Sequence, residues 1–179
     1  AHQWATENAE QMFYAAEMTH FYANTCVNFI ELRRGMRVWI EWLQAALASS
    51  LQYAELNKNV ITHTGNLGAA YAHLGETVPA IRYCRKHLAL ARRNADRAAE
   101  LNALSNLGIL YRNLGQIERA VRFFKKCYKL AAELSERATE ANALGNLGVS
   151  YAILGDSEKA LEYHQKSFAI FNELGDIRR

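Results

Sequence analysis

Apolar residues recur every three or four positions through residues 98–114, which is the spacing of one face of an α-helix. A second stretch with the same spacing runs through residues 118–134. Polar residues occupy the positions between, so each stretch is expected to form a helix with one buried face. The apolar positions of the first stretch are Leu101, Leu104, Leu107, Leu110, Tyr111 and Leu114. Those of the second are Val121, Phe124, Tyr128 and Ala131.

This helix pair is one copy of an internal repeat. The decapeptides NLGAAYAHLG, NLGILYRNLG and NLGVSYAILG begin at Asn66, Asn106 and Asn146, 40 residues apart, and agree at six of ten positions. The last glycine of the decapeptide has a further counterpart one period earlier, at Gly35. A divergent fourth copy is therefore expected to precede the three clear ones.

Glycine and proline positions predict where the helices begin and end. The glycine that closes each decapeptide is expected to end the first helix, because glycine reaches the left-handed conformation cheaply. The second helices are predicted to begin near Thr77, Ile117 and Ser157, with Thr77 and Ser157 as N-caps. Pro79 then falls in a first turn, where its missing N–H does no harm. The closing glycines are Gly75, Gly115 and Gly155.

Two further repeated positions indicate close packing between the helices of a pair. Each decapeptide opens with the tripeptide Asn-Leu-Gly. The leucine of this tripeptide and the tyrosine four residues after it share a helix face and are expected to be buried. The tripeptide's glycine lies where the first helix crosses the second, and a side chain there is expected to clash with Ala80, Ala120 or Ala160. These crossing glycines are Gly68, Gly108 and Gly148.

The pattern G…Y…LG…A over paired helices resembles the tetratricopeptide repeat (TPR). With its 40-residue period, its NLG motif and its ELGD ending, it is similar to the subclass of the LGN/Pins polarity adaptors and kinesin light chains. It is similar also to the C-terminal arms of bacterial STAND-type signalling ATPases such as NB-ARC proteins. The resemblance covers residues 64–176 and, in weaker form, residues 21–56. It implies an all-α fold, a right-handed TPR superhelix (α-solenoid) of helix-turn-helix repeats.

The divergent N-terminal copy favours the ATPase arms among these relatives. The segment FIELRRGMRVWIEWLQAAL, residues 29–47, resembles the tryptophan-bearing unit that begins such arms. Trp39, Ile40 and Trp42 are expected to pack the cap of the superhelix. The alternative is any aromatic-rich capping helix that seals an exposed core.

The repeat divides the chain into segments of predicted structure. An N-terminal capping helix is expected over residues 1–20 and the divergent TPR-like repeat over residues 21–57. Three TPR units follow over residues 58–97, 98–137 and 138–179, the last of which includes the truncated start of a further repeat. Uncapped solenoid ends expose core, so a longer parent protein or self-association through these ends is expected.

Asparagines recur on one face of the first helices. Asn66, Asn106 and Asn146 share one position, and Asn102 and Asn142 stand one turn earlier. The resemblance implies that this face lines a concave groove, where amide side chains hydrogen-bond the main chain of a bound peptide. The alternative is that these asparagines bridge adjacent first helices and only stabilise the superhelix.

Other candidate residues follow from the same helical face and its margins. Ile109 and Val149 are expected to floor an apolar pocket in the groove, and His73 and Arg112 to lie near its mouth. A second set, made of charged residues, recurs at the junctions between repeats. The resemblance implies that such residues contact the ligand at the rim of the groove. The alternative for this set is helix-end ion pairs of little energetic value. Its members are Arg97, Arg137, Glu100 and Glu140.

Composition narrows the classes of partner. The chain has 179 residues, of which 50% are hydrophobic, and its net charge is only +3 with no basic run. Neither nucleic acid nor an anionic membrane is expected as a partner. No apolar run reaches the length of about 20 residues that spans a membrane. Cys26, Cys84 and Cys127 form no C-x-x-C pair, which favours reduced thiols and a cytoplasmic location.

No motif for chemistry is present in the sequence. The histidines are scattered rather than grouped at metal-ligand spacing, and neither a phosphate-binding P-loop nor a nucleophile elbow occurs. We therefore expect no cofactor, no metal and no catalysis in this segment. The function predicted is binding of a protein or peptide in the groove, as the ligand-sensing arm of a larger NB-ARC/STAND-type ATPase. The alternative is a stand-alone LGN- or kinesin-light-chain-like scaffold adaptor, with an enzyme as a remote third reading.

Overall fold

The structure, a computed structural model, describes residues 33–52 and 59–176 of the chain. Within these ranges the backbone forms seven α-helices and no strand, which confirms the predicted all-α repeat fold. The capping helix expected over residues 1–20 and the thiol of Cys26 lie outside the described residues. The helices are α2 (Arg33–Gln52), α3 (Val60–His73), α4 (Thr77–Arg93), α5 (Arg97–Asn113), α6 (Ile117–Glu133), α7 (Arg137–Ile153) and α8 (Ser157–Asp176).

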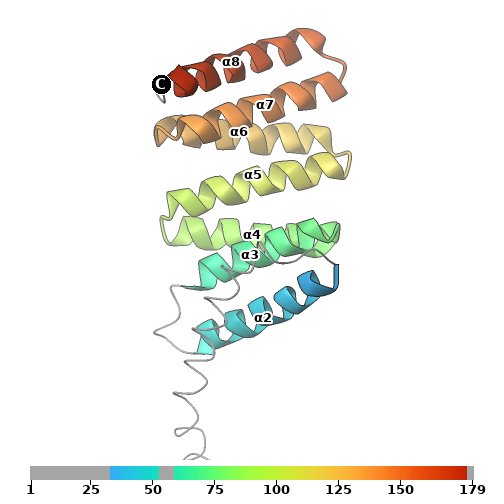
Figure 1. Ribbon diagram of the computed structural model, residues 1–179, viewed down its shortest axis with the longest axis vertical. Helices are drawn as coiled ribbons and strands as arrows, with labels where there is room; N and C mark the ends of the chain where they lie inside the picture. The colour runs from blue at the N-terminus through green and yellow to red at the C-terminus, as the bar shows by residue number, and fades with distance from the viewer. Residues whose placement is uncertain (1–32, 53–58, 177–179) are drawn as a thin grey trace, which may run out of the picture. The chain divides into compact units, whose positions relative to one another are not determined.

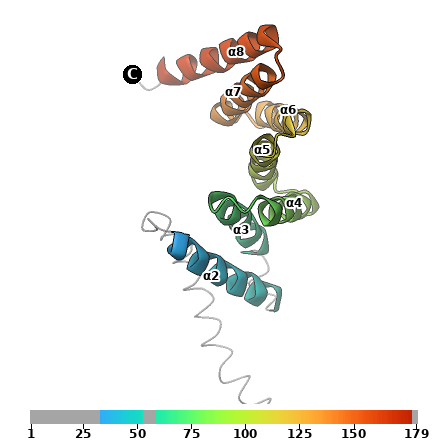
Figure 2. The same ribbon diagram turned by 90° about the vertical axis from the view of Figure 1, so that its right-hand side faces the viewer.

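The chain divides into two compact units, Ala1–His87 and Leu88–Arg179. In the first unit, α2 packs on α3. In the second, α5 packs on α6, α6 on α7 and α7 on α8, so that these four helices stack in chain order (Figures 1 and 2). Each helix of the second unit thus buries its apolar stripe against its neighbours in the chain, as the repeat pattern predicts.

The first helices end as predicted, at glycines in the left-handed conformation. The φ angles of Gly75, Gly115 and Gly155 are 77°, 72° and 80°. The N–H of Gly115 donates to the Arg112 carbonyl at 2.9 Å, which is one of the two bonds that typically close such a helix end. At the ends of α4 and α6 the left-handed residues are Ala95 and Ser135, which the sequence pattern did not indicate.

The predicted N-caps are wrong by one residue. Thr77 is the first residue of α4, and Ser157 is the first residue of α8. At α8 the cap is Asp156, whose Oδ1 accepts from the N–H of Lys159 at 3.0 Å. Asp96 does the same for α5, accepting from the N–H of Ala99 at 2.9 Å. A carboxylate also interacts favourably with the helix dipole, which favours it at this position.

Most of the predicted core positions are buried, whereas Tyr71, Tyr128 and Tyr151 are half-buried and Leu114 and Trp42 are exposed. Leu107, Leu147 and Phe124 are fully buried. Leu114 instead lies at the end of α5 with 43% of its surface exposed, because the helix stops before the stripe returns to the core. In the first unit, Trp39 and Ile40 are buried as expected, but Trp42 on the same helix is 44% exposed.

Aromatic pairs join the two helices of each repeat. Tyr111 of α5 stacks on Phe123 of α6 with ring centroids 5.3 Å apart and planes 9° from parallel. Tyr151 and Tyr163 make the same contact between α7 and α8, with centroids 5.4 Å apart. The repeated tyrosine therefore holds the first helix to the second through its ring.

The crossing glycines do lie against the second helix, but not against the predicted alanines. A Cβ added to Gly108 would lie 2.4 Å from Cε1 of Phe124, and one added to Gly68 would lie 2.7 Å from Sγ of Cys84. The contact is therefore made one helical turn beyond Ala80 and Ala120. Gly148 lies in the same way against the ring of His164.

Candidate functional site

The predicted row of asparagines is present on the surface of α5 and α7. Asn102 and Asn142 are exposed, and Asn106 and Asn146 stand one turn later and are half-buried. Asn102, Asn106 and Asn142 have no hydrogen-bond partner for their side chains among the described residues. Three amides on these two helices are thus available to a ligand.

Asn146 differs from the other asparagines because a neighbouring first helix engages it. Nη1 of Arg112 on α5 donates to its Oδ1 at 2.7 Å. This is the bridge between adjacent first helices that the structural alternative predicts. The residue one period before Arg112 is Ala72, so the same bond cannot form at every repeat. The asparagine row is therefore mixed, with a structural member in α7 and unbonded members beside it.

Apolar side chains flank the asparagines on the same face. Ile109 follows Asn106 by three residues on α5 and is half-buried, whereas Val149 at the same place on α7 is 40% exposed. Ile109 and Val149 thus lie on the same two helices as the asparagines, in the second unit. The two remaining predicted groove residues, Asn66 and His73, lie on α3 in the first unit.

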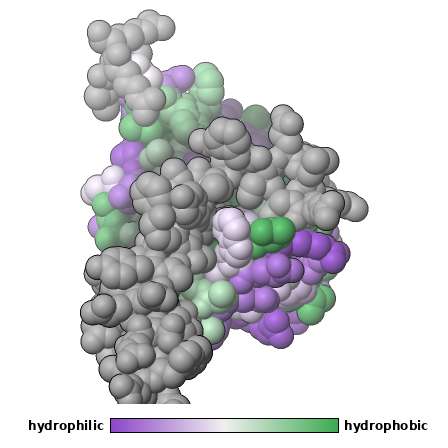
Figure 3. All heavy atoms as spheres, turned by 60° about the horizontal axis from the view of Figure 1, so that its bottom comes forward, coloured by the Kyte–Doolittle hydropathy of each residue, from purple (hydrophilic) through white to green (hydrophobic). Residues whose placement is uncertain are grey.

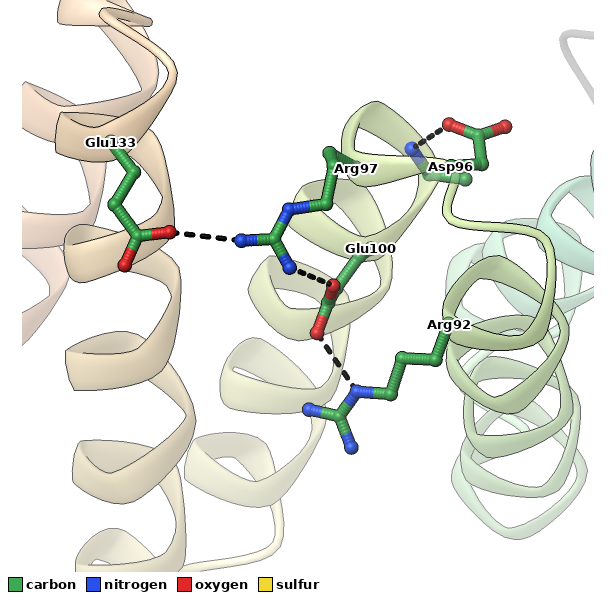
Figure 4. Close-up of polar contacts among 6 residues, drawn as sticks. Arg92, Asp96, Arg97, Glu100 and Glu133 are labelled. Carbon is green, nitrogen blue, oxygen red and sulfur yellow. Dashed lines mark hydrogen bonds and ion pairs between the residues drawn. The ribbon is translucent and has the colours of Figure 1, made fainter.

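The predicted rim residues form ion pairs with one another and with residues of the neighbouring helices. Arg97 donates to Glu100 at 3.1 Å and to Glu133 of α6 at 2.9 Å, while Arg92 donates to Glu100 at 2.8 Å (Figure 4). One period later, Arg137 pairs in the same way with Glu140 and with a glutamate of α8. A ligand that contacts these arginines has to compete with existing bonds.

Both carboxylates at the centre of these networks are buried. Glu100 and Glu140 are each only 7% exposed. A buried carboxylate without a cationic partner is costly, so Arg97 and Arg137 are needed where they stand. The geometry fits the alternative interpretation, in which these residues form ion pairs at helix ends. The two glutamates are, however, more deeply buried than residues of a solvated rim.

A hollow that the sequence did not reveal lies beside the first of these networks. It is open to solvent, has a volume of about 290 Å³ and is lined by the end of α4, by α5 and by α6. We call it the basic hollow because its polar wall holds four cations and two carboxylates. These are Arg92, Arg97, Lys126, Lys129, Glu100 and Glu133. One feature of the sequence could have indicated this hollow. Arg92 and Lys129 are replaced by alanine at the corresponding positions of the next repeat, Ala132 and Ala169.

Comparison with known proteins decides the family. The sequence model of the tetratricopeptide repeat family matches residues 59–133 and a second, overlapping range, residues 102–173. Together the two matches cover more than half of the chain. The chain belongs to the tetratricopeptide repeat family.

Solved structures support the same TPR fold. BtubC (BKLC) from P. vanneervenii is 22% identical, with a TM-score of 0.76 over 92% of this chain and 64% of that one. Aspartyl phosphate phosphatase F from Bacillus subtilis is 18% identical, with a TM-score of 0.77 over 94% of this chain. The TPR chain spans only 42% of the length of that phosphatase. A kinesin light chain with nearly identical TPR-like repeats, from Podosopora anserina, is 16% identical with a TM-score of 0.63 over 97% of this chain and 94% of that one. No curated protein matches by sequence.

Helix α8, the last helix that the structure describes, carries an exposed apolar face. Leu161 and Phe168 are 60% and 66% exposed, and Phe171 is 44% exposed. In the preceding repeat the corresponding positions of Leu161 and Phe171 are Val121 and Ala131, which are buried. Self-association through solenoid ends stays a prediction, and this face is the surface on which it would act.

The described part of the chain offers no metal site or membrane span. No three histidine, cysteine or acidic side chains come together there in a geometry that could hold a metal ion. None of its helices is both long and apolar enough to cross a bilayer. The face seen in Figure 3 is mixed, with hydrophilic residues next to hydrophobic ones.

The two described cysteines are buried free thiols in the repeat core. Burial raises the pKa of Cys84 and of Cys127 to about 11. Removal from water disfavours the charged thiolate, so both groups remain protonated at neutral pH. This environment is that of an unreactive thiol.

The thiols provide a test of the folded core. In a Cys26→Ser variant at pH 8, we expect a thiol-reactive disulfide reagent to label Cys84 and Cys127 roughly 100-fold more slowly than in the same chain unfolded in guanidinium. Labelling is followed by absorbance, and the unfolded chain is the control. Equal rates in the two states would contradict the burial of these thiols.

Proposed function

We propose that this chain is a non-catalytic TPR module that binds an extended segment of a partner protein along α5 and α7. The observation that carries the proposal is the set of exposed or half-buried amides at Asn102, Asn106 and Asn142, which have no bonds within the described residues. An amide side chain can donate to a carbonyl and accept from an N–H, and so can bond a peptide main chain of any sequence.

The spacing of the amides suits an extended peptide. Asn102 and Asn106 are four residues apart on α5, a rise of about 6 Å along the helix. Two residues of an extended chain span about 6.6 Å. A peptide that runs along α5 can therefore present a main-chain group to each asparagine. Its alternate side chains then face Ile109 of α5 and Val149 of α7, which supply apolar contact.

The setting in which this module works is the finer part of the proposal. The resemblance of residues 29–47 to the first unit of ATPase arms favours the ligand-sensing arm of an NB-ARC/STAND-type regulator. The likeness to a kinesin light chain structure favours the alternative, a stand-alone scaffold adaptor. In either setting the partner is a protein segment, the location is the cytoplasm and the chain contributes no catalytic step.

A peptide-selection experiment tests the groove. Ligands are selected from a displayed library of random 12-residue peptides, and their affinities for the wild-type chain and for an Asn102→Ala, Asn106→Ala, Asn142→Ala variant are compared. We expect the triple variant to lose at least about tenfold in affinity, since each lost hydrogen bond contributes about 1 kcal/mol. Its helicity and melting temperature should be no lower than those of the wild type, because none of the three amides is bonded within the described residues and alanine has the higher helix propensity.

Two further variants serve as controls for this experiment. Asn172→Ala removes an exposed amide from α8 and should leave peptide affinity unchanged. Asn146→Ala removes the partner of Arg112 and should lower the melting temperature instead. Undiminished binding by the triple variant, or a triple variant that loses its fold, would reject the groove proposal.

A further inference from the structure

The charges that line the basic hollow are not balanced. Both terminal nitrogens of Arg97 are engaged, since one bonds Glu100 and the other bonds Glu133. Arg92 adds a second bond to Glu100, so the two carboxylates are compensated by the two arginines. The charges of Lys126 and Lys129 remain without a carboxylate partner among the described residues. The hollow therefore holds two positive charges in excess.

Hydrogen-bond donors in the hollow are also unused. Arg92 reaches Glu100 through Nε alone. In Figure 4 its two terminal nitrogens point away from the carboxylate. Within the described residues neither of them forms a hydrogen bond. A guanidinium edge of this kind matches two oxygens of a phosphate or carboxylate at once, whereas a lysine contributes a mobile point charge.

Two of the four cations of the hollow, Arg92 and Lys129, are not required by the repeat, whereas Lys126 recurs as Lys86 and Lys166. The pairing of Arg97 with Glu100 and Glu133 recurs one period later, and so belongs to the framework of the TPR array. Arg92 and Lys129 do not recur, because alanine occupies both positions in the next copy. Arg92 and Lys129 are thus particular to this hollow, since the next repeat folds with alanine at both positions.

We propose that the basic hollow binds a doubly charged phosphate group. The two uncompensated lysines match the charge of a phosphate dianion, and the free edge of Arg92 supplies two directed donors. Leu104 and Leu130 add an apolar part to the lining, which suits the short carbon stem of a phosphorylated side chain. Free phosphate and a phosphorylated partner share this chemistry. The hollow is separate from the asparagine row, so the proposal stands independently of peptide binding.

Calorimetric titration at constant ionic strength tests the proposal. The probes are inorganic phosphate, the tripeptide Gly-phosphoserine-Gly and unphosphorylated Gly-Ser-Gly. We expect saturable binding of both phosphate probes to the full chain and none of the third. Tighter binding of the phosphopeptide would assign the hollow to phosphorylated partners, and equal binding would assign it to the free anion.

A charge-matched pair of variants locates the binding. Lys126→Ala with Lys129→Ala should weaken phosphate binding by at least about tenfold without loss of fold, because neither lysine has an ion pair. Arg93→Ala with Arg122→Ala removes the same charge from exposed positions outside the hollow and should change binding less than about twofold. No saturable binding by the wild type, or an equal loss in both variants, would overturn the proposal.

Discussion

Replacing Phe124 by alanine is expected to lower the free energy of unfolding by about 3–5 kcal/mol, the typical cost of deleting a buried aromatic ring. Phe124 has no exposed surface and fills the space between α6 and the crossing glycine Gly108 of α5. Its ring also lies 5.8 Å below the guanidinium of Arg112. The cavity left by its removal cannot close fully, because the close-packed residues around a deleted ring relax only partially.

Urea denaturation followed by circular dichroism at 222 nm measures this loss. Phe168→Ala on α8 is the matched control, since its ring is 66% exposed and contributes little to the core. The control should change the free energy of unfolding by less than about 0.5 kcal/mol. Equal losses in the two variants would show that Phe124 is not the packing centre that its burial indicates.

The second large effect is expected from Gly108→Ala, which should destabilise the chain by about 1–3 kcal/mol. The added Cβ would lie 2.4 Å from Cε1 of Phe124, well inside van der Waals contact. Because the ring is fully buried, it cannot swing into solvent to make room. The overlap must be relieved by moving α5 against α6.

The same change at Gly148 should have the opposite result. Its Cβ would meet the ring of His164 at 2.7 Å, but His164 is exposed on α8 and can rotate away. Alanine then gains about 1 kcal/mol of helix propensity over glycine. Gly148→Ala is therefore expected to be neutral or stabilising in the same denaturation experiment. A loss of similar size at both positions would contradict this account of the crossing.

Much of the fold could be read from the recurrence of residues in the chain. The starts of α4, α6 and α8 and the glycine ends of the first helices follow from local conformational preferences. The contact of Gly108 with Phe124 rather than Ala120 could not be read, because it depends on the angle and register at which two helices cross. Periodicity fixes which face is buried, but not which residue on the facing helix is met.

The candidate site was predictable in its members and not in its bonds. Asn102, Asn106 and Asn146 were identified by their common position, yet only Asn146 is bridged, because Arg112 occurs in one repeat alone. The burial of Glu100 was missed for a similar reason, since an exposed and a buried carboxylate look alike in sequence. The repeat pattern predicts the features that all copies share. It does not predict a contact that depends on a residue present in one copy alone.

The position of the tryptophans has a consequence for spectroscopy. All three precede residue 88, and Trp39 is buried in α2 of the first unit. The tryptophan emission of the native chain therefore originates in the first unit only, whereas its helical ellipticity comes from both units. Unfolding curves recorded by the two methods coincide only if the units melt together. Tryptophan fluorescence thus reports on the folding of the first unit alone, because the second unit contains no tryptophan.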